Sequence, residues 1–286
     1  MKNLLYILPF SFFIVQACNS QENDKYLNNP VAGINSKPLI NVEGTTIHER
    51  FNAPEGYERV DAAPNSFAHY LRNLPLKPDG SIVKFYNGKL KSNNVYAAVI
   101  DLEIGHKDLH QCADAVMRLR AEHLWNQKQY DQIHFNFTNG FRVDYSKWMQ
   151  GKRVAIEGNK TYWKSGGTAS NSYMTFWKYM ELIFSYAGTL SLDKELHSKP
   201  VNEMQIGDVF IHGGSPGHAV IIVDMAINKI TKEKLFMIVQ SYMPAQETQL
   251  LLNFNNKDLS PWYSVNFGEQ LQTPEWNFSS NELKSF

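Results

Sequence analysis

Four apolar segments follow one another closely in the second half of the chain, and they restrict the possible folds more than any other feature. They are DVFIHGG, GHAVIIVDMAI, KLFMIVQSYM and ETQLLLNF, and the polar turn NKITKE joins the second to the third. Short apolar runs separated by turn residues are typical of neighbouring β-strands. We therefore expect these segments to form an antiparallel meander.

Helical patterns precede the meander. The segment from Asp108 to Gln127 has apolar residues at helical spacing, and PNSFAHYLRNL begins with capping residues. SNSYMTFWKYMELIFSYAG has Ser170 or Asn171 as its cap and stops at Gly188. Further strands or hairpins are predicted for TTIHERF, SIVKFYNGKL, VYAAVIDLEI and IHFNFTNGFRVDY. Helices followed by a meander indicate the α+β class.

The N-terminus has the pattern of a secretory signal peptide. Lys2 precedes an apolar run from Leu4 to Val15, which is too short to span a bilayer comfortably. The run ends in Val-Gln-Ala-Cys, which resembles the lipobox of bacterial lipoproteins. In that case Cys18 is lipidated and becomes the first mature residue. The alternative is an ordinary signal peptide cleaved nearby.

This pattern predicts the organisation of the whole chain of 286 residues. Residues 1–18 are expected to be a signal peptide, residues 19–39 a flexible tether rich in Asn, Ser, Pro and Gly, and residues 40–286 a single α+β domain. We expect a monomer in the bacterial cell envelope, attached to the membrane through lipid on Cys18. Acidic and basic residues number 28 each, which argues against a nucleic-acid partner.

Lipidation of Cys18 would leave Cys112 as the only thiol of the mature domain, since the chain has two cysteines. With Asp108 as the N-cap, Cys112 would occupy about the fourth position of its helix. The free N–H groups and partial positive charge of a helix N-terminus lower the pKa of a thiol and can hold an oxyanion. The alternative is that Cys112 belongs to the apolar stripe of the helix and is simply buried.

Two other residues could complete a catalytic site with Cys112. His218 opens the second strand of the meander, where a rigid backbone would hold a general base in place. Gln240 lies at the end of the next strand and could accept the imidazole N–H, which would fix the tautomer. Asp224 competes for this role, but it lies six residues along the strand from His218, or about 20 Å.

These motifs, in this order, resemble the papain-like superfamily of cysteine hydrolases, and within it the NlpC-type and CHAP-type cell-wall peptidases and amidases. The resemblance implies that the helix bearing the cysteine packs on the antiparallel meander. It also implies a Cys112–His218–Gln240 triad that cleaves amides through a thioester, with Gln111 supporting the oxyanion. The context Gln-Cys-Ala-Asp differs from the Asp or Asn before the cysteine, and the Ser-Gly after it, that are usual in those families.

Over its whole length the chain is similar to a narrower group. LPLKPDGS, QCADAVMRLRAE, QSYMPAQE, SPWY and the segment from Gly207 to Met225 resemble the domain of unknown function 4846 family. That family consists largely of exported proteins of Bacteroidetes-type bacteria. The resemblance implies no substrate, so the peptidase hypothesis depends on the residues of the triad.

Other candidate residues are less specific. The aromatic residues Tyr86, Trp163 and Tyr242 could line a groove for peptide or sugar, or be ordinary core and surface residues. His106 and His110 have a spacing found in zinc sites, but His106 precedes the helix cap and need not share a face with His110. We expect no metal and no cofactor.

Two hypotheses follow from the sequence. The first is an exported, membrane-anchored cysteine peptidase or amidase that acts on cell-wall or other peptides. The second is a lipoprotein on the same scaffold that binds peptide or glycan without turnover.

Overall fold

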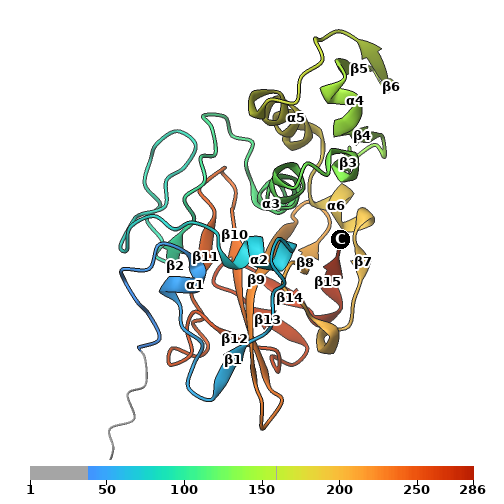
Figure 1. Cartoon of the computed structure of the whole chain (residues 1–286). Coiled ribbons are helices and arrows are strands. Elements are labelled where there is room, and N and C mark those ends of the chain that lie inside the picture. The colour runs from blue at the N-terminus through green and yellow to red at the C-terminus, as the bar shows by residue number, and fades with distance from the viewer. Residues whose placement is uncertain (1–37, 159) are drawn as a thin grey trace, which may run out of the picture. The chain divides into compact units, whose positions relative to one another are not determined.

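A nine-stranded antiparallel sheet organises the computed structural model, which describes residues 38–158 and 160–286 (Figure 1). Its strands run in the order β2-β11-β10-β9-β8-β15-β7, with β1 paired to β9 and β12 paired to β10. The bounds are β1 (Tyr57–Arg59), β2 (Tyr96–Val99), β7 (His197–Ser198), β8 (Val209–His212), β9 (His218–Asn228), β10 (Lys234–Gln240), β11 (Gln249–Leu251), β12 (Tyr263–Ser264) and β15 (Leu283–Ser285). The expected meander is confirmed as the neighbours β8, β9, β10 and β11.

The central strand β9 is buried on both faces. Its first nine residues are all buried. Successive side chains of a strand point to opposite faces, so Ala219 and Ile221 pack toward the helices, whereas Val220 and Ile222 pack against Phe278 and other residues of the C-terminal segment. A layer on each face explains why this segment is a continuous apolar run in the sequence.

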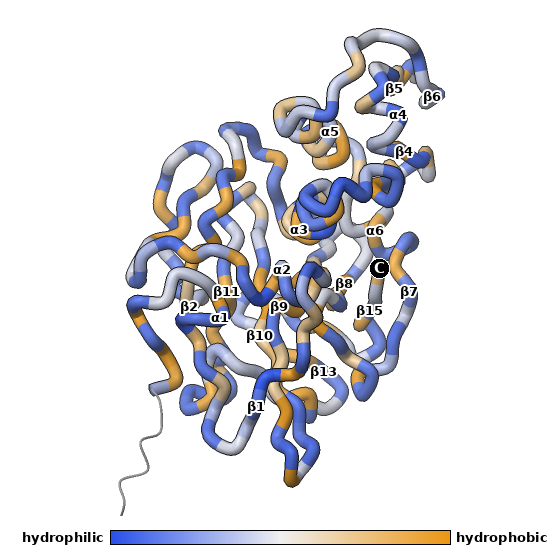
Figure 2. Tube along the Cα trace, in the orientation of Figure 1, coloured by the Kyte–Doolittle hydropathy of each residue, from blue (hydrophilic) through white to orange (hydrophobic). Residues whose placement is uncertain are grey.

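Helices cover one face of the sheet (Figure 1). α3 (Cys112–Asn126) packs on β9 and also contacts α2 (Phe67–Arg72), α5 (Tyr173–Tyr186) and α6 (Thr189–Glu195). Figure 2 shows hydrophobic residues along α3, α5 and the central strands. The shorter elements are α1 (Ile47–Arg50), α4 (Tyr145–Met149) and the hairpins β3 (His134–Asn136) with β4 (Arg142–Asp144), β5 (Lys152–Glu157) with β6 (Lys160–Ser165), and β13 (Gln270–Gln272) with β14 (Asn277–Ser279).

The α+β prediction is confirmed, but some local predictions are wrong. TTIHERF contains the helix α1 and not a strand, because the Thr46 side chain accepts the Glu49 N–H and caps a helical turn. Ser172 caps α5, in place of Ser170 or Asn171. Residues 1–37, which include the predicted signal peptide, Cys18 and nearly all of the predicted tether, lie outside the described residues. Within the described part, no helix has the length and apolar character needed to span a membrane.

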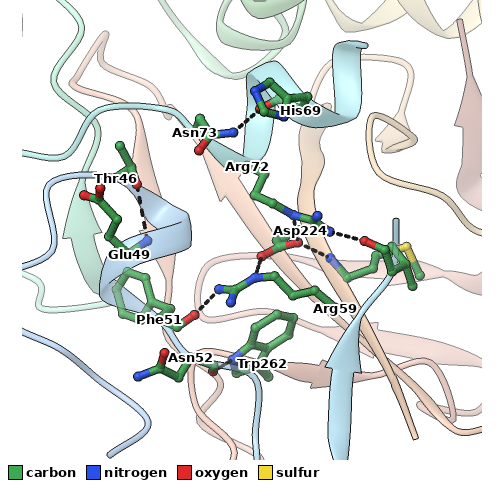
Figure 3. Close-up of polar contacts among 12 residues, drawn as sticks. Thr46, Glu49, Phe51, Asn52, Arg59, His69, Arg72, Asn73, Asp224 and Trp262 are labelled. Atoms are coloured by element: carbon green, nitrogen blue, oxygen red, sulfur yellow. Dashed lines mark hydrogen bonds and ion pairs between the residues drawn. The ribbon is translucent and has the colours of Figure 1, made fainter. Parts of the chain in front are cut away.

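A buried ion cluster joins β1 and α2 to the middle of β9 (Figure 3). The fully buried carboxylate of Asp224 accepts from Arg59 Nε at 2.6 Å and from Arg72 Nε at 2.7 Å. Its Oδ1 also accepts the N–H of Met225 at 2.8 Å. Asp224 is therefore fully engaged far from the mouth of β9, in agreement with the distance argument that excluded it as a partner of His218.

Candidate active site at the mouth of strand β9

The helix that carries the candidate nucleophile begins later than expected. Gln111 is the N-cap of α3 and Cys112 is its first residue, whereas the sequence predicted Asp108 as the cap. Gln111 thus takes the N-cap position, and Asp114 takes the N3 position, where its carboxylate accepts the Gln111 N–H at 3.0 Å. Asp108 instead accepts the N–H of Ala245 at 2.7 Å and so connects the helix start to the loop after β10.

The Cys112 thiol lies against the first residues of β9. Its residue is 9% exposed. Burial, and after it the carboxylate of Asp114, raises the pKa of the thiol to about 11, while the N–H groups of Ala219 and Ala113 act in the opposite direction. This is opposite to the lowered pKa expected at a helix N-terminus, because loss of solvent outweighs the field of the helix. Among the described residues, the one side-chain hydrogen bond of the His218 ring is to Gln240, and none joins the ring to the Cys112 sulfur.

The imidazole of His218 is enclosed by aromatic rings at the start of β9. It is 1% exposed, and its ring centre is 4.8 Å from that of Tyr242, 5.6 Å from Trp276 and 5.8 Å from Phe278. Burial lowers the pKa of His218 to about 4, although the bond to Gln240 acts against this shift. The imidazole is therefore neutral at pH 7, as a general base requires.

The glycine before His218 allows a close backbone approach. A Cβ atom at Gly217 would collide with Thr189 Oγ1 and lie 2.6 Å from the carbonyl oxygen of Gly214. Glycine is therefore needed for the turn that leads into β9 and sets the position of His218.

Gln240 contacts His218 as the sequence suggested. Nε2 of His218 lies 2.8 Å from Oε1 of Gln240. The other end of the amide, Gln240 Nε2, donates to Glu275 Oε2 at 2.6 Å, and Lys91 Nζ pairs with the same oxygen at 2.7 Å. Lys91 and Glu275 were not found from the sequence, because they lie far from the motifs and no local pattern links them.

The other candidate residues differ in whether they contact the His218 ring. The Gln111 side chain donates to Asp108 at 3.2 Å, so it is already engaged at the helix start. Tyr242 borders the His218 ring, and Tyr86 donates its backbone N–H to Ala245 at 2.9 Å.

Trp163 does not join these groups. It lies in the β5–β6 hairpin, which Figure 1 shows beyond α4 and α5, where its ring contacts Phe141 and Lys147. Tyr162 and Trp163 are residues of the strand β6.

Comparison with protein families decides the relationship of the chain. The family model described as domain of unknown function (4846) matches residues 47–285. The chain belongs to this family. Comparisons with curated proteins and with solved structures give no match. The match to the domain of unknown function 4846 spans Cys112, His218, Gln240, Lys91 and Glu275.

One cavity of the protein lies next to the candidate site, and another lies apart from it. A cavity of about 430 Å³ has Lys91 in its wall, together with residues 78–82 and β2. Another, of about 400 Å³, is lined by residues of α3 and α5, among them Arg118 and Trp177. Neither lining includes Cys112 or His218. The described residues contain no cluster of three or more His, Cys, Asp or Glu side chains suited to a metal ion.

Proposed function

We propose that this chain is a cysteine hydrolase that cleaves amide bonds, and that it is exported and lipid-anchored at Cys18 in the bacterial cell envelope. One observation carries the proposal: the 2.8 Å contact between His218 Nε2 and Gln240 Oε1 at the start of β9, the strand on which α3 packs with Cys112 as its first residue. An imidazole whose Nε2 donates to a carbonyl oxygen keeps Nδ1 as its basic nitrogen. A nucleophile, a base and a group that orients the base are the parts that covalent amide cleavage requires.

The proposed reaction has two halves. Cys112 Sγ attacks the amide carbonyl while His218 Nδ1 takes the thiol proton, and the same proton is then given to the leaving amine. The C–N bond breaks and a thioester forms. Water then attacks the thioester with His218 as its base, which releases the acid and restores the thiol. The Cys112 N–H at the start of α3 would hold the oxyanion, and Gln240 would keep His218 in place.

In the proposed mechanism, the thiol proton of Cys112 moves to His218 during the attack on the substrate and not before it. Transfer of the proton from the Cys112 thiol to the His218 imidazole would cost roughly 9 kcal/mol, because the two pKa values are about 11 and about 4. The attraction between two unit charges at about 4 Å is only about 4 kcal/mol at an effective dielectric constant of about 20. The resting pair is therefore neutral, and His218 acts as a general base when the substrate is bound.

A papain-like scaffold is the finer fold that accompanies this proposal. The cysteine begins α3, α3 packs on β9, and β10 carries the group that orients the base. This order of elements supports the proposal. Cell-wall peptide is the proposed substrate, because the proposed location in the envelope contains it and the balanced charge of the chain does not favour nucleic acid.

The test is hydrolysis of cell-wall material by the purified protein. We expect new amine and carboxyl termini in peptidoglycan fragments, lost in Cys112→Ala and reduced about 100-fold or more in His218→Ala. Met243→Ala is a matched control, since Met243 is 64% exposed and lies next to Tyr242. Activity that survives in Cys112→Ala would exclude a thioester mechanism.

A second function is favoured by the burial of both reactive groups. Cys112 is 9% exposed and His218 is 1% exposed, as in a site that does not react. In this alternative, the protein binds peptide or glycan without turnover. Binding of the same fragments with unchanged affinity in Cys112→Ala, and no new termini, would support it.

A further inference from the structure

A continuous series of side-chain contacts leads away from His218 through three other residues. His218 contacts Gln240, Gln240 donates to Glu275, and Glu275 pairs with Lys91. We infer that Lys91 and Glu275 are positioning residues that set the orientation of the Gln240 amide and, through it, the tautomer of His218. The inference rests on the proposed function for its catalytic meaning, but the tautomer itself can be measured independently.

The first step concerns the Gln240 amide. A carboxylate only accepts hydrogen bonds, so the group that Gln240 presents to Glu275 at 2.6 Å must be its NH₂. The other end of the amide, which lies 2.8 Å from His218 Nε2, is then the carbonyl oxygen. The amide orientation follows from the charge of Glu275.

The second step concerns the imidazole. The Gln240 carbonyl oxygen only accepts, so His218 must present Nε2–H to it. A neutral imidazole has one proton on its ring nitrogens, and Nδ1 is therefore unprotonated. That tautomer leaves Nδ1 as the basic nitrogen of the ring. The opposite orientation of the amide would place a donor against Nε2 and move the proton to Nδ1.

An ion pair with Lys91 holds the Glu275 carboxylate in place. The Lys91 side chain is 5% exposed, and its ammonium shares the Oε2 acceptor with Gln240 while also donating to Gln249 Oε1 at 3.3 Å. Burial of an ammonium and a carboxylate is tolerated because they are paired. Lys91 is therefore the cationic end of this series of hydrogen bonds, in which the donor or acceptor role of each group is fixed.

The backbone around Glu275 is also constrained. Glu275 lies in the turn between β13 and β14, where the Thr273 N–H donates to the Trp276 carbonyl at 2.9 Å. The Trp276 ring itself packs against His218. The turn therefore fixes the carboxylate relative to the imidazole that it controls.

The test is nitrogen NMR of the protein with ¹⁵N-labelled histidine at pH 7, in which a ring N–H and a bare ring nitrogen have distinct shifts. His218→Asn identifies the His218 signals among the nine histidines. We expect a proton on Nε2 in the wild type and in Glu275→Gln, whose amide oxygen can still accept from Gln240. In Glu275→Leu, and in the double variant Lys91→Leu with Glu275→Leu that leaves no unpaired ammonium, we expect a substantial Nδ1–H population. Hydrolysis should then fall at least about tenfold in kcat with little change in KM.

The wild-type spectrum alone can overturn the inference, even where a variant does not fold. A proton on Nδ1 in the wild type, or an unchanged Nε2–H in the folded leucine variants, would contradict it. If the tautomers shift as expected but the wild type cleaves no peptide, the positioning role stands and the proposed hydrolase function fails.

Discussion

The reactivity of Cys112 toward an alkylating reagent gives the sharpest account of the resting site. The perturbation is pH, from about 6 to 10, and the measured quantity is the rate at which iodoacetamide modifies the peptide that contains Cys112, followed by mass spectrometry. The thiolate is the reactive form, so the rate reports its population. The same residue in the urea-unfolded chain is the reference.

The magnitude follows from the pKa of the buried thiol. At pH 7.5 a thiol with a pKa of about 11 is about 0.03% ionised, against about 9% for a free cysteine with a pKa of about 8.5. Folded Cys112 should therefore react roughly 300-fold more slowly than the unfolded chain. The rate should rise about tenfold per pH unit up to pH 10, without a plateau.

The His218→Ala variant separates the resting state from catalysis. If the resting pair is neutral, removal of the imidazole leaves the slope of the alkylation rate against pH unchanged, although hydrolysis is lost. A plateau between about pH 6 and 8 at a rate equal to or above that of the unfolded chain would refute this reasoning. It would mean that a thiolate–imidazolium pair already exists in the free protein.

Two further predictions concern stability. Asp224→Ala leaves the buried guanidinium of Arg72 and the partly buried one of Arg59 without their carboxylate, and should lower the free energy of unfolding by about 3–5 kcal/mol in urea titration. Glu58→Ala breaks the exposed pair with Lys229 and should change the free energy of unfolding far less. Equal losses in the two variants would contradict the special role of the cluster. Because the pKa of His218 is lowered, the unfolded chain binds a proton on this residue between about pH 6.5 and 4 and the folded chain does not. The free energy of unfolding is therefore at its full value above about pH 6.5 and falls by about 3 kcal/mol as the pH is lowered toward 4. His218→Gln should reduce this dependence, and an unchanged pH profile would contradict the assigned shift.

Local pattern was sufficient for most of the framework. The four strands from β8 to β11, the helix α5 and the β3–β4 hairpin follow from apolar periodicity and turn residues, because these signals lie within a few residues of one another. Membership of the domain of unknown function 4846 family was also readable from conspicuous blocks, and the family model confirms it. The pairing of His218 with Gln240 was predicted because both lie at the ends of adjacent strands.

Other features were decided only by the folded chain. α3 begins at Cys112, later than the sequence predicted, because the Asp108 carboxylate accepts the N–H of Ala245, a residue far from it in the sequence. The environment of the thiol depends on Asp114 and on the packing of α3 against β9, so its pKa is raised where helix position alone predicted a lower value.

The roles of Lys91 and Glu275 likewise arise from proximity in space. Neither residue belongs to a motif, and the part-buried contact between Lys91 and Glu275 joins residues that are 184 positions apart in the chain. Sequence periodicity records which face of an element is apolar, and it therefore determined the sheet and the helices of this protein. Burial and long-range polar contacts are properties of the assembled structure, and they determined the protonation and orientation of the candidate site.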